Sequence, residues 1–515
     1  MSKKTVVLMI LDGWGEGERN EANPIYTAKP KIFNSLKYNY PCGLLQASGI
    51  AVGLPWNEEG NSEVGHLTLG AGRVIYQNYP RIALSIKDKS FFENKALKGA
   101  FENAKKNNSC VNIVGLLSAP STYVHSSTEH LMALIKFAKQ EGVKYNLHLF
   151  TDGRDSPPYS SLELIKGLSE KTKNIVSLAG RYWAMDRAKH WDRTEKTYKV
   201  LTGDSPLAEN YEESIKRTHK KLNDEYVEPM LLGPENRGIK DNDSVIFFNF
   251  REDRMRQIVE PFVNKDFKEF PVKQFSNLYI ATMISYRDDF KVNVAFPPEK
   301  EKNPLGKILA DNGKIQLRLT ETEKYAHVTY FFNGLVEKPF ENEFRILIPS
   351  RMDLKPDEHP EMRANEITNR LIQAIEEKAF DFIFVNYANS DIIAHTGNYE
   401  ATKKVVEIID QALEKIITTV LRQDAILILT SDHGNIEKMF DPMTGQIETK
   451  HDNNPVPFYL IAKNLQRQKE PLQAEKEIKN VIGVLSDIAP TILKLLDIEK
   501  PSEMTGQNLV KYLNI

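Results

Sequence analysis

The sequence predicts an α/β fold with mostly parallel sheets, in which one domain made of two chain segments is split by an inserted second domain. Three observations support this prediction. Short apolar runs alternate with amphipathic helical stretches, acidic residues follow three of these runs, and the candidate metal ligands occur only towards the two ends of the chain. This alternation excludes all-β and helical-bundle folds.

Strands are expected wherever a short apolar run ends at a polar or glycine-containing turn. The expected strands are residues 6–11, 111–117, 145–150, 174–178, 244–248, 278–283, 315–319, 344–348, 380–385, 425–429 and 458–461. A helix is expected over residues 126–140, because apolar residues recur there at helical spacing and Gly142 provides a stop. Further helices are expected at residues 366–378 and 399–421.

Length and composition narrow the possible classes of protein. The 515 residues, 41% of them hydrophobic, suffice for two to four domains. The net charge of −2 gives no reason to expect a nucleic-acid or membrane partner. Cys42 and Cys110 are the only cysteines, which favours a reducing compartment, although a single bridge stays open. Since no run resembles a signal peptide or a membrane span, we expect a cytoplasmic protein.

Two segments are candidate crossings between domains, residues 76–80 and residues 296–304. The second contains Pro297-Pro298 and a run of alternating charges, which oppose regular structure. On composition alone, two ordinary surface loops explain them equally well. The candidate metal ligands lie only before the first segment and after the second. We therefore expect a metal-binding domain of residues 1–76 and 304–515, and an inserted substrate-binding domain of residues 77–303.

Acidic residues and histidines form the candidate metal site. Asp12, Asp391 and Asp432 each follow an expected strand, and two of them have a histidine close by. One Asp-His pair is usually a solvated surface pair, but several such groups after buried strands indicate a metal site. Ligands without thiolate favour Mn, Zn, Fe or Mg. The candidate groups outnumber the ligands of one ion: Asp12, Ser62, Asp391, His395, Asp432, His433 and His451.

Ser62 lies in a Gly-Asn-Ser turn before an expected helix. One interpretation is a helix N-cap. The other is a nucleophile, because a hydroxyl at a helix N-terminus beside a cation is favoured as an alkoxide and then as a phosphate ester. The residues alone favour neither interpretation. With two metals, the second describes a phosphoryl-transfer centre.

A second group of candidate residues follows the strands of the middle segment. Arginine binds phosphate and carboxylate through two-point contacts, so arginines at four strand ends favour a site for a small ligand carrying both groups over separate surface ion pairs. Asp155 is either a general acid or base or an ion-pair partner of Arg154. Lys324, in a polar turn after residues 315–319, is either a phosphate contact or solvated. The group consists of His125, Arg154, Asp155, Arg181, Arg187, Arg251 and Arg254.

Taken together, these motifs resemble the cofactor-independent phosphoglycerate mutases of the alkaline phosphatase superfamily. The resemblance covers nearly the whole chain. It rests on Leu11-Asp12-Gly13-Trp14-Gly15, Gly60-Asn61-Ser62-Glu63-Val64-Gly65-His66, Asp152-Gly153-Arg154-Asp155, Gly180-Arg181-Tyr182, Met185-Asp186-Arg187, Glu321-Thr322-Glu323-Lys324-Tyr325-Ala326-His327-Val328-Thr329, Ala394-His395-Thr396-Gly397, Ser431-Asp432-His433-Gly434-Asn435 and Asn454-Pro455-Val456-Pro457-Phe458.

The resemblance implies a three-layer, alkaline-phosphatase-like domain and a specific division of roles. Asp391, His395 and His451 would hold one divalent ion, usually manganese, with Mg, Zn or Co as alternatives. Asp12, Ser62, Asp432 and His433 would hold the other. Substrate contacts would come from His125, Arg154, Asp155, Arg181, Arg187, Arg251, Arg254 and Lys324, with Asp155 as a proton carrier.

The implied activity is interconversion of 3-phosphoglycerate and 2-phosphoglycerate by a monomer, through phospho-Ser62 and without bisphosphoglycerate. We expect the inserted domain to close over the metal domain, with the two linkers as hinges. The alternatives are a phosphomonoesterase with the same metal core, and a non-catalytic protein that binds a phosphorylated metabolite. The fate of the phosphoryl group distinguishes the first alternative, because a mutase forms 2-phosphoglycerate and a phosphomonoesterase releases inorganic phosphate. The presence of Ser62 and of the complete ligand set argues against the second alternative.

Some positions differ from the family pattern. Glu252 replaces a proline between the substrate arginines, where its charge is expected to weaken binding. Ser390 replaces a proline before Asp391, and Asp452 replaces a threonine after His451. Around His125, the usual glycines and second histidine are replaced by Thr122, Tyr123 and Ser127, so the shape of this loop is the least secure expectation.

Overall fold

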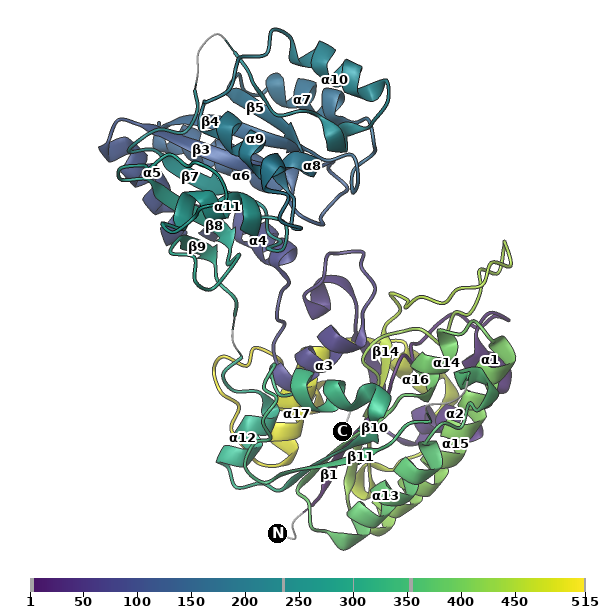
Figure 1. Ribbon diagram of the computed structural model, residues 1–515. Coiled ribbons are helices and arrows are strands. Elements are labelled where there is room, and N and C mark those ends of the chain that lie inside the picture. Colours follow the sequence, from purple (N-terminus) through teal and green to yellow (C-terminus); the bar gives the residue numbers. More distant parts are fainter. Residues whose placement is uncertain (1–3, 234–236, 300, 352–354, 514–515) are drawn as a thin grey trace. The chain divides into compact units, whose positions relative to one another are not determined.

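The chain folds into two α/β units in the computed structural model, which describes residues 4–233, 237–299, 301–351 and 355–513. Unit 1 comprises Met1–Tyr76 and Glu299–Ile515, and unit 2 comprises Gln77–Pro298. Figure 1 shows a sheet flanked by helices in each unit. The predicted α/β class is confirmed. Lys300, in the charged segment of the second expected crossing, lies outside the described residues.

The sheet of unit 1 has eight strands in the order β11-β10-β12-β1-β13-β14-β2-β15. Strand β14 runs antiparallel to β13 and β2, and the other neighbouring pairs are parallel. The strands are β1 (Val6–Leu11), β2 (Cys42–Gln46), β10 (Gln316–Glu321), β11 (Glu343–Ile348), β12 (Phe382–Tyr387), β13 (Ile426–Thr430), β14 (Val456–Ala462) and β15 (Val481–Val484).

Helices cover both faces of this sheet, which gives unit 1 three layers (Figure 1). The alternation of β1 shows the division, because Val7 and Met9 belong to one apolar core and Leu8 and Ile10 to the other. The first core includes residues of α1 (Pro24–Ala28), α2 (Lys31–Asn39), α13 (Ala364–Glu377), α14 (Asn389–Ala394), α15 (Tyr399–Arg422) and α16 (Pro471–Ile478). The second includes residues of α3 (Ser62–Ala71), α12 (Leu305–Asp311) and α17 (Ile488–Leu495).

The sheet of unit 2 has the strand order β6-β5-β4-β3-β7-β8-β9, in which only the β5–β6 pair is antiparallel among the described residues. Its strands are β3 (Cys110–Leu117), β4 (Lys144–Thr151), β5 (Ile175–Gly180), β6 (Met230–Leu231), β7 (Ser244–Phe247), β8 (Tyr279–Ile284) and β9 (Asn293–Phe296). Its helices are α4 (Asn78–Lys87), α5 (Lys95–Lys106), α6 (Thr128–Glu141), α7 (Ser161–Ser169), α8 (Arg181–Ala184), α9 (Trp191–Leu201), α10 (Tyr211–His219) and α11 (Arg256–Val263).

Local chemistry explains where the predicted helix of unit 2 begins and ends. Ser127 caps α6, with its hydroxyl accepting a hydrogen bond from the backbone of Glu129 at 3.2 Å. Gly142 ends the helix in the left-handed region, with φ of 65°. The helix therefore starts two residues after the expected position.

Both cysteines are free thiols. Among the described residues, helices that combine the length and the apolar character needed to cross a bilayer are absent.

Candidate metal centre and anion site

The predicted metal ligands converge at the carboxyl ends of three neighbouring strands of unit 1. Asp12 follows β1, Asp391 lies on the short helix α14 after β12, and Asp432 follows β13. Because β1 pairs in parallel with both β12 and β13, these strand ends meet at one edge of the sheet. His433 completes the first group, with its Nε2 atom 3.5 Å from Asp12 Oδ1 and 3.5 Å from Asp432 Oδ2.

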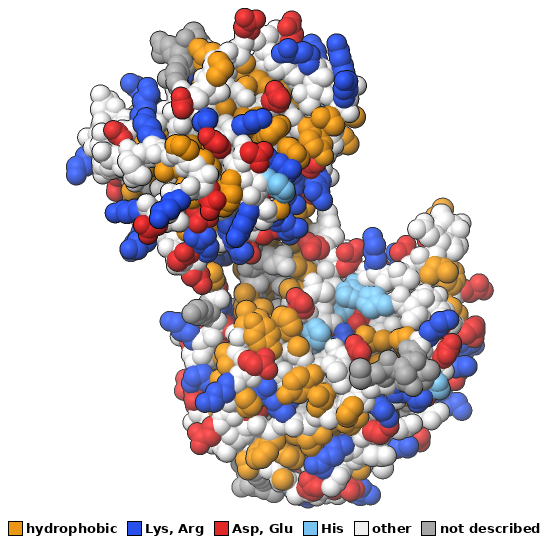
Figure 2. Space-filling model, in the orientation of Figure 1, with side chains coloured by type: hydrophobic (Ala, Val, Ile, Leu, Met, Phe, Trp, Pro, Cys, Tyr) orange, Lys and Arg blue, Asp and Glu red, His pale blue; other side chains and the backbone are white. Residues whose placement is uncertain are grey.

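A second group forms around Asp391. Its Oδ1 atom lies 3.2 Å from His395 Nε2 and 3.3 Å from His451 Nε2. His433 Nε2 is 4.0 Å from the same oxygen, so the two groups adjoin. Asp12, Asp432 and His433 are fully buried, whereas the side chain of His395 is 41% exposed. Figure 2 shows histidines gathered on one face of unit 1.

Backbone carbonyls fix the orientation of the three histidines. The Nδ1 atoms of His395 and His451 each lie 2.7 Å from a carbonyl oxygen, of Thr449 and Gly60 respectively. His433 Nδ1 lies 3.3 Å from the carbonyl oxygen of Gly434. A carbonyl only accepts, so Nδ1 carries a proton in each ring, and Nε2 is the atom that faces the carboxylates and is available to a bound cation. This donor set of imidazoles and carboxylates fits divalent cations.

Ser62 is the first residue of α3, and the N-cap interpretation of Ser62 is wrong. Asn61 is the cap, since its side-chain oxygen accepts from the backbone of Val64 at 3.1 Å. The Ser62 hydroxyl lies 2.9 Å from His433 Nε2 and donates to Asp12 Oδ1 at 3.1 Å. At Gly65, a Cβ atom would lie 2.7 Å from the backbone oxygen of Asp432, so only glycine lets α3 pack this close to the ligand loop.

Lys324 lies in the turn after β10 and is 4% exposed, which excludes the solvated alternative. Its Nζ atom donates to Asp12 Oδ1 at 2.6 Å, to Ser62 Oγ at 2.7 Å and to Asp391 Oδ2 at 2.7 Å. Burial lowers the pKa of Lys324, but the charges of Asp12, Asp391 and Asp432 outweigh it and raise the pKa above its ordinary value. The raised pKa favours the cationic form of the amine beside the serine.

Three buried side chains that sequence reasoning left without a role contact the ligand carboxylates. Asn386 donates to Asp12 Oδ2 at 2.7 Å, and Asn435 donates to Asp391 Oδ1 at 2.9 Å. His66 Nδ1 lies 3.2 Å from Asp432 Oδ2. The available signal was a polar residue within a buried strand, as with Asn386 near the end of β12.

Glu437 forms hydrogen bonds with three loops that follow or adjoin candidate metal ligands. Its carboxylate accepts hydrogen bonds from the backbone of Gly15 at 2.9 Å, from the backbone of Asn435 at 2.9 Å and from the side chain of Asn454 at 3.2 Å. Burial raises the pKa of Glu437 to about 7. This residue was also without a role in the sequence interpretation.

In unit 2, the predicted anion-binding residues gather at the carboxyl ends of β3, β4, β5 and β7. Arg181 is buried, and its Nη1 atom donates to Asp152 at 2.6 Å and to Asp155 at 2.5 Å. His125 Nε2 lies 3.7 Å from Asp155 Oδ2. Asp155 therefore pairs with Arg181, and of its two alternatives the ion pair with Arg154 is not found among the described residues.

The remaining arginines form the outer part of the same cluster. Arg187 and Arg251 both pair with Asp253, at 2.6 Å and 3.0 Å. Burial lowers the pKa of Arg254, and the charges of Arg181, Arg187 and Arg154 lower it further, so positive charge is concentrated here. Arg154 has a side chain that is 60% exposed and lies 3.9 Å from Glu225.

The positions that differ from the family pattern have local partners. Glu252 lies 3.6 Å from Arg256, one helical turn along the chain. The Asp452 carboxylate accepts from the backbone of Asn454 at 3.0 Å and lies 3.5 Å from Lys438. Ser390 is buried, and its hydroxyl has no hydrogen-bond partner among the described residues. Neither Glu252 nor Asp452 displaces a candidate ligand.

Comparison with known proteins agrees with this geometry. A family model described as the metalloenzyme superfamily matches residues 4–500. The 2,3-bisphosphoglycerate-independent phosphoglycerate mutase of Clostridium botulinum (strain ATCC 19397 / Type A) is 44% identical over 524 residues, covering 99% of this chain and 100% of that protein. The 2,3-bisphosphoglycerate-independent phosphoglycerate mutase 1 of Methanosarcina barkeri (strain Fusaro / DSM 804) is 44% identical over 522 residues, covering 99% of this chain and 98% of that protein. The crystal structure of Leishmania mexicana phosphoglycerate mutase at low cobalt concentration matches with a TM-score of 0.52 and 27% sequence identity. The match covers 99% of this chain and 98% of that chain.

Proposed function

Since the chain belongs to the 2,3-bisphosphoglycerate-independent phosphoglycerate mutases, which interconvert 3-phosphoglycerate and 2-phosphoglycerate, we propose that it performs this isomerisation through a phosphoserine at Ser62. We further propose that unit 1 carries the phosphoryl group and that unit 2 binds the glycerate. The function is thus an intramolecular phosphoryl transfer in two half-reactions. In the first the phosphoryl group passes from the glycerate to Ser62, and in the second it returns to the other hydroxyl of the glycerate.

The observation that carries this proposal is the environment of the Ser62 hydroxyl. A cationic amine, an imidazole nitrogen and a carboxylate oxygen lie within 3.1 Å of Ser62 Oγ. The oxygen is also at the start of α3, where free backbone N–H groups favour negative charge. The amine and the helix N-terminus stabilise an alkoxide or a phosphate ester, and the imidazole and the carboxylate are candidate metal ligands.

Two divalent cations, manganese by our proposal, would be held by the two groups described above. Asp391, His395 and His451 would bind one, and Asp12, Ser62, Asp432 and His433 the other. When bound, such ions supply positive charge that favours the deprotonated serine oxygen and offsets charge on the phosphoryl group. Asn386 and Asn435 would hold the carboxylates of Asp12 and Asp391 in place.

The residues of this chain then carry the reaction. Ser62 reacts as the alkoxide, its proton released to solvent, and its Oγ atom forms a bond to phosphorus as the bond from phosphorus to the glycerate oxygen breaks. That oxygen takes up a proton, for which we propose Asp155 as the carrier. The other glycerate hydroxyl then returns its proton to Asp155 and attacks phospho-Ser62, which breaks the bond between phosphorus and Ser62 Oγ and restores the alkoxide. Lys324 stays protonated and balances charge on Ser62 throughout.

Binding of the glycerate is assigned to the arginine cluster of unit 2. A carboxylate and two hydroxyls suit the forked donors of Arg181, Arg251 and Arg254, with His125 and Arg187 beside them. Holding the glycerate near its reaction partner gives an effective molarity of about 10⁵ M or more, so that it outcompetes water.

The test is phosphorus nuclear magnetic resonance of 3-phosphoglycerate incubated with the metal-stripped chain, with Mn, Mg, Zn or Co restored in turn and no bisphosphoglycerate added. The proposal expects 2-phosphoglycerate, with manganese giving the fastest conversion. Release of inorganic phosphate instead would identify a phosphomonoesterase. No conversion with any metal would leave only the binding of a phosphorylated metabolite.

We propose that the chain acts as a monomer in the cytoplasm. The free thiols of Cys42 and Cys110 suit a reducing compartment. Light scattering coupled to size-exclusion chromatography tests the first point, with 58.8 kDa expected for one chain.

A further inference from the structure

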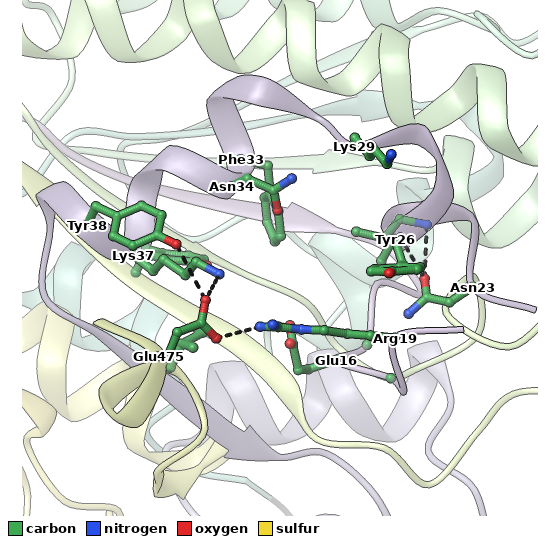
Figure 3. A pocket seen from close by; sticks show the side chains of 15 residues that line it. Glu16, Arg19, Asn23, Tyr26, Lys29, Phe33, Asn34, Lys37, Tyr38 and Glu475 are labelled. Atoms are coloured by element: carbon green, nitrogen blue, oxygen red, sulfur yellow. Dashed lines mark hydrogen bonds and ion pairs between the residues drawn. The ribbon is translucent and has the colours of Figure 1, made fainter. Parts of the chain in front are cut away.

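A cavity of about 340 Å³ opens in unit 1 between α1, α2, α16 and strand β14 (Figure 3). Phe33 and Tyr459, both almost fully buried, line it as an edge-to-face pair with ring centroids 5.7 Å apart. The volume and the aromatic lining are those of small-molecule sites. The residues that line it include none of the candidate metal ligands.

On one side of this cavity, an acidic residue is paired with two basic residues. Figure 3 shows Glu475 joined to Arg19 and Lys37, at 2.5 Å each, and Tyr38 donates to the same carboxylate at 3.4 Å. Both cations are therefore already engaged. Lys29 is exposed at the rim.

Among the described residues that line the cavity, Glu16 has the acidic side chain without a partner. It lines the cavity and makes no hydrogen bond or ion pair with any other residue that the structure describes. Burial raises the pKa of Glu16, and the charges of Arg19 and Lys37 lower it only in part. Its backbone is anchored by a hydrogen bond to the carbonyl of Pro455 at 2.8 Å. The carboxylate is part-buried in the cavity wall, so a bound ligand could supply the donor that the described residues do not.

A second polar group points to the same partner. Within the described part of the chain, the hydroxyl of Tyr459 also has no hydrogen-bond partner, although the residue is only 2% exposed and lines the cavity. A ligand that satisfies both groups needs hydrogen-bond donors directed at the carboxylate and a flat body that packs on the rings. An anion would instead face the carboxylates of Glu16 and Glu475.

We propose that this cavity binds a small planar cation with paired N–H donors, of the amidinium or guanidinium class. Two parallel N–H groups match the two oxygens of the Glu16 carboxylate. The flat face of the ligand packs against Phe33 and Tyr459, and a further donor reaches the Tyr459 hydroxyl. The site is separate from the mutase chemistry and does not depend on the role of Ser62.

The experiment uses benzamidine as the probe and benzoate as its control of matched shape and opposite charge. Saturation-transfer nuclear magnetic resonance on the full-length, manganese-loaded chain measures the dissociation constant of each. Benzamidine is expected to bind at least about tenfold more tightly than benzoate, as a charge-assisted contact requires. Glu16→Gln should weaken benzamidine binding at least about tenfold, because the amide keeps the shape and loses the charge.

Glu18→Gln is the matched control, since it makes the same change on an exposed residue of the same loop and should leave the dissociation constant unaltered. Tyr459→Phe should weaken benzamidine binding by a smaller factor and serves if Glu16→Gln does not fold. Equal binding of the two probes, unchanged binding to Glu16→Gln, or no saturation by benzamidine at about 10 mM would each overturn the proposal.

Discussion

The amine of Lys324 donates a hydrogen bond of 2.7 Å to the hydroxyl oxygen of Ser62, although 262 positions separate the two residues in the chain. The same amine contacts Asp12 and Asp391, so it links the carboxylates of both candidate metal groups to the serine. The reactive oxygen is therefore held by contacts between the two chain pieces of unit 1, rather than by its own turn.

Ser62→Ala is expected to lower the rate of conversion of 3-phosphoglycerate by at least about 10³-fold, because the phosphoryl group loses its acceptor. Phosphorus nuclear magnetic resonance measures the rate, and calorimetry should show that phosphoglycerate still binds. Ser48→Ala is the control, since its hydroxyl contacts only the backbone carbonyl of Asn453. Undiminished conversion by Ser62→Ala would remove Ser62 from the mechanism.

Lys324→Met should lower kcat by at least about 100-fold, because a buried cation beside the serine is replaced by an uncharged chain of similar length. Asp12 and Asp391 then face each other without the amine. The measurement is steady-state kinetics at saturating manganese, with the exposed Lys404→Met as the matched control. A normal kcat in Lys324→Met would restrict this residue to stability.

Asn386→Ala is expected to weaken manganese binding by about 10- to 100-fold, because Asp12 loses the donor that orients it. Isothermal titration calorimetry measures the dissociation constant. Asn333→Ala provides the control, since Asn333 is equally buried in unit 1 but donates to Glu343. If both variants bind manganese like the unchanged chain, the contact to Asp12 has no orienting role.

His130→Phe should make the protein more resistant to acid. His130 is fully buried between Tyr79 and Phe250, and neither ring nitrogen has a partner among the described residues. Burial lowers the pKa of His130 to about 3 from the ordinary value of 6.5. Between these values the unfolded chain binds the extra proton, so the free energy of unfolding falls as the pH falls below 6.5.

Phenylalanine keeps the ring packing without this proton. From pH 7.5 to 5.5, the free energy of unfolding of His130→Phe relative to the unchanged chain should rise by about 1.4 kcal/mol. Urea unfolding at both pH values measures it. If the free energy of unfolding of His130→Phe differs from that of the unchanged chain by the same amount at both pH values, the folded state accommodates the charged ring and the prediction is wrong.

Glu252→Gln tests the charge that differs from the family pattern. Since Glu252 is paired with Arg256, its effect on the substrate arginines should be small, with KM lowered by about two- to threefold at low ionic strength and unchanged at high salt. Steady-state kinetics at both salt concentrations provides the measurement, with Glu269→Gln, also exposed, as the control. A rise in KM would contradict the expected repulsion.

Much of the fold follows from local patterns. Strand β1 occupies the residues expected for it, because every one of its residues is apolar and buried. Strand β12 was expected to end at residue 385 but continues through Asn386, whose side-chain NH2 group donates to Asp12. Strands β2 and β15 were not expected, because both are short and contain a glycine, and β15 lies exposed at the sheet edge.

The same distinction separates the site residues that sequence could indicate from those that it could not. Asp432 and His433 are adjacent in the chain and follow a buried strand, so their chemistry is visible locally. Asn386 and Asp12 are 374 positions apart, and an asparagine has no ligand signature of its own. The roles of His66 and Glu437 likewise depend on loops that only the folded sheet brings together.

The central place of β1, between β12 and β13, has a consequence for biosynthesis. Its partners lie in the last third of the chain, so β1 must wait for most of the polypeptide that follows it before it can pair. Unit 2 is one uninterrupted stretch and can fold meanwhile. A nascent chain released early would therefore carry a folded unit 2 and an unpaired β1. The apolar residues of β1 would then be exposed to chaperones and proteases.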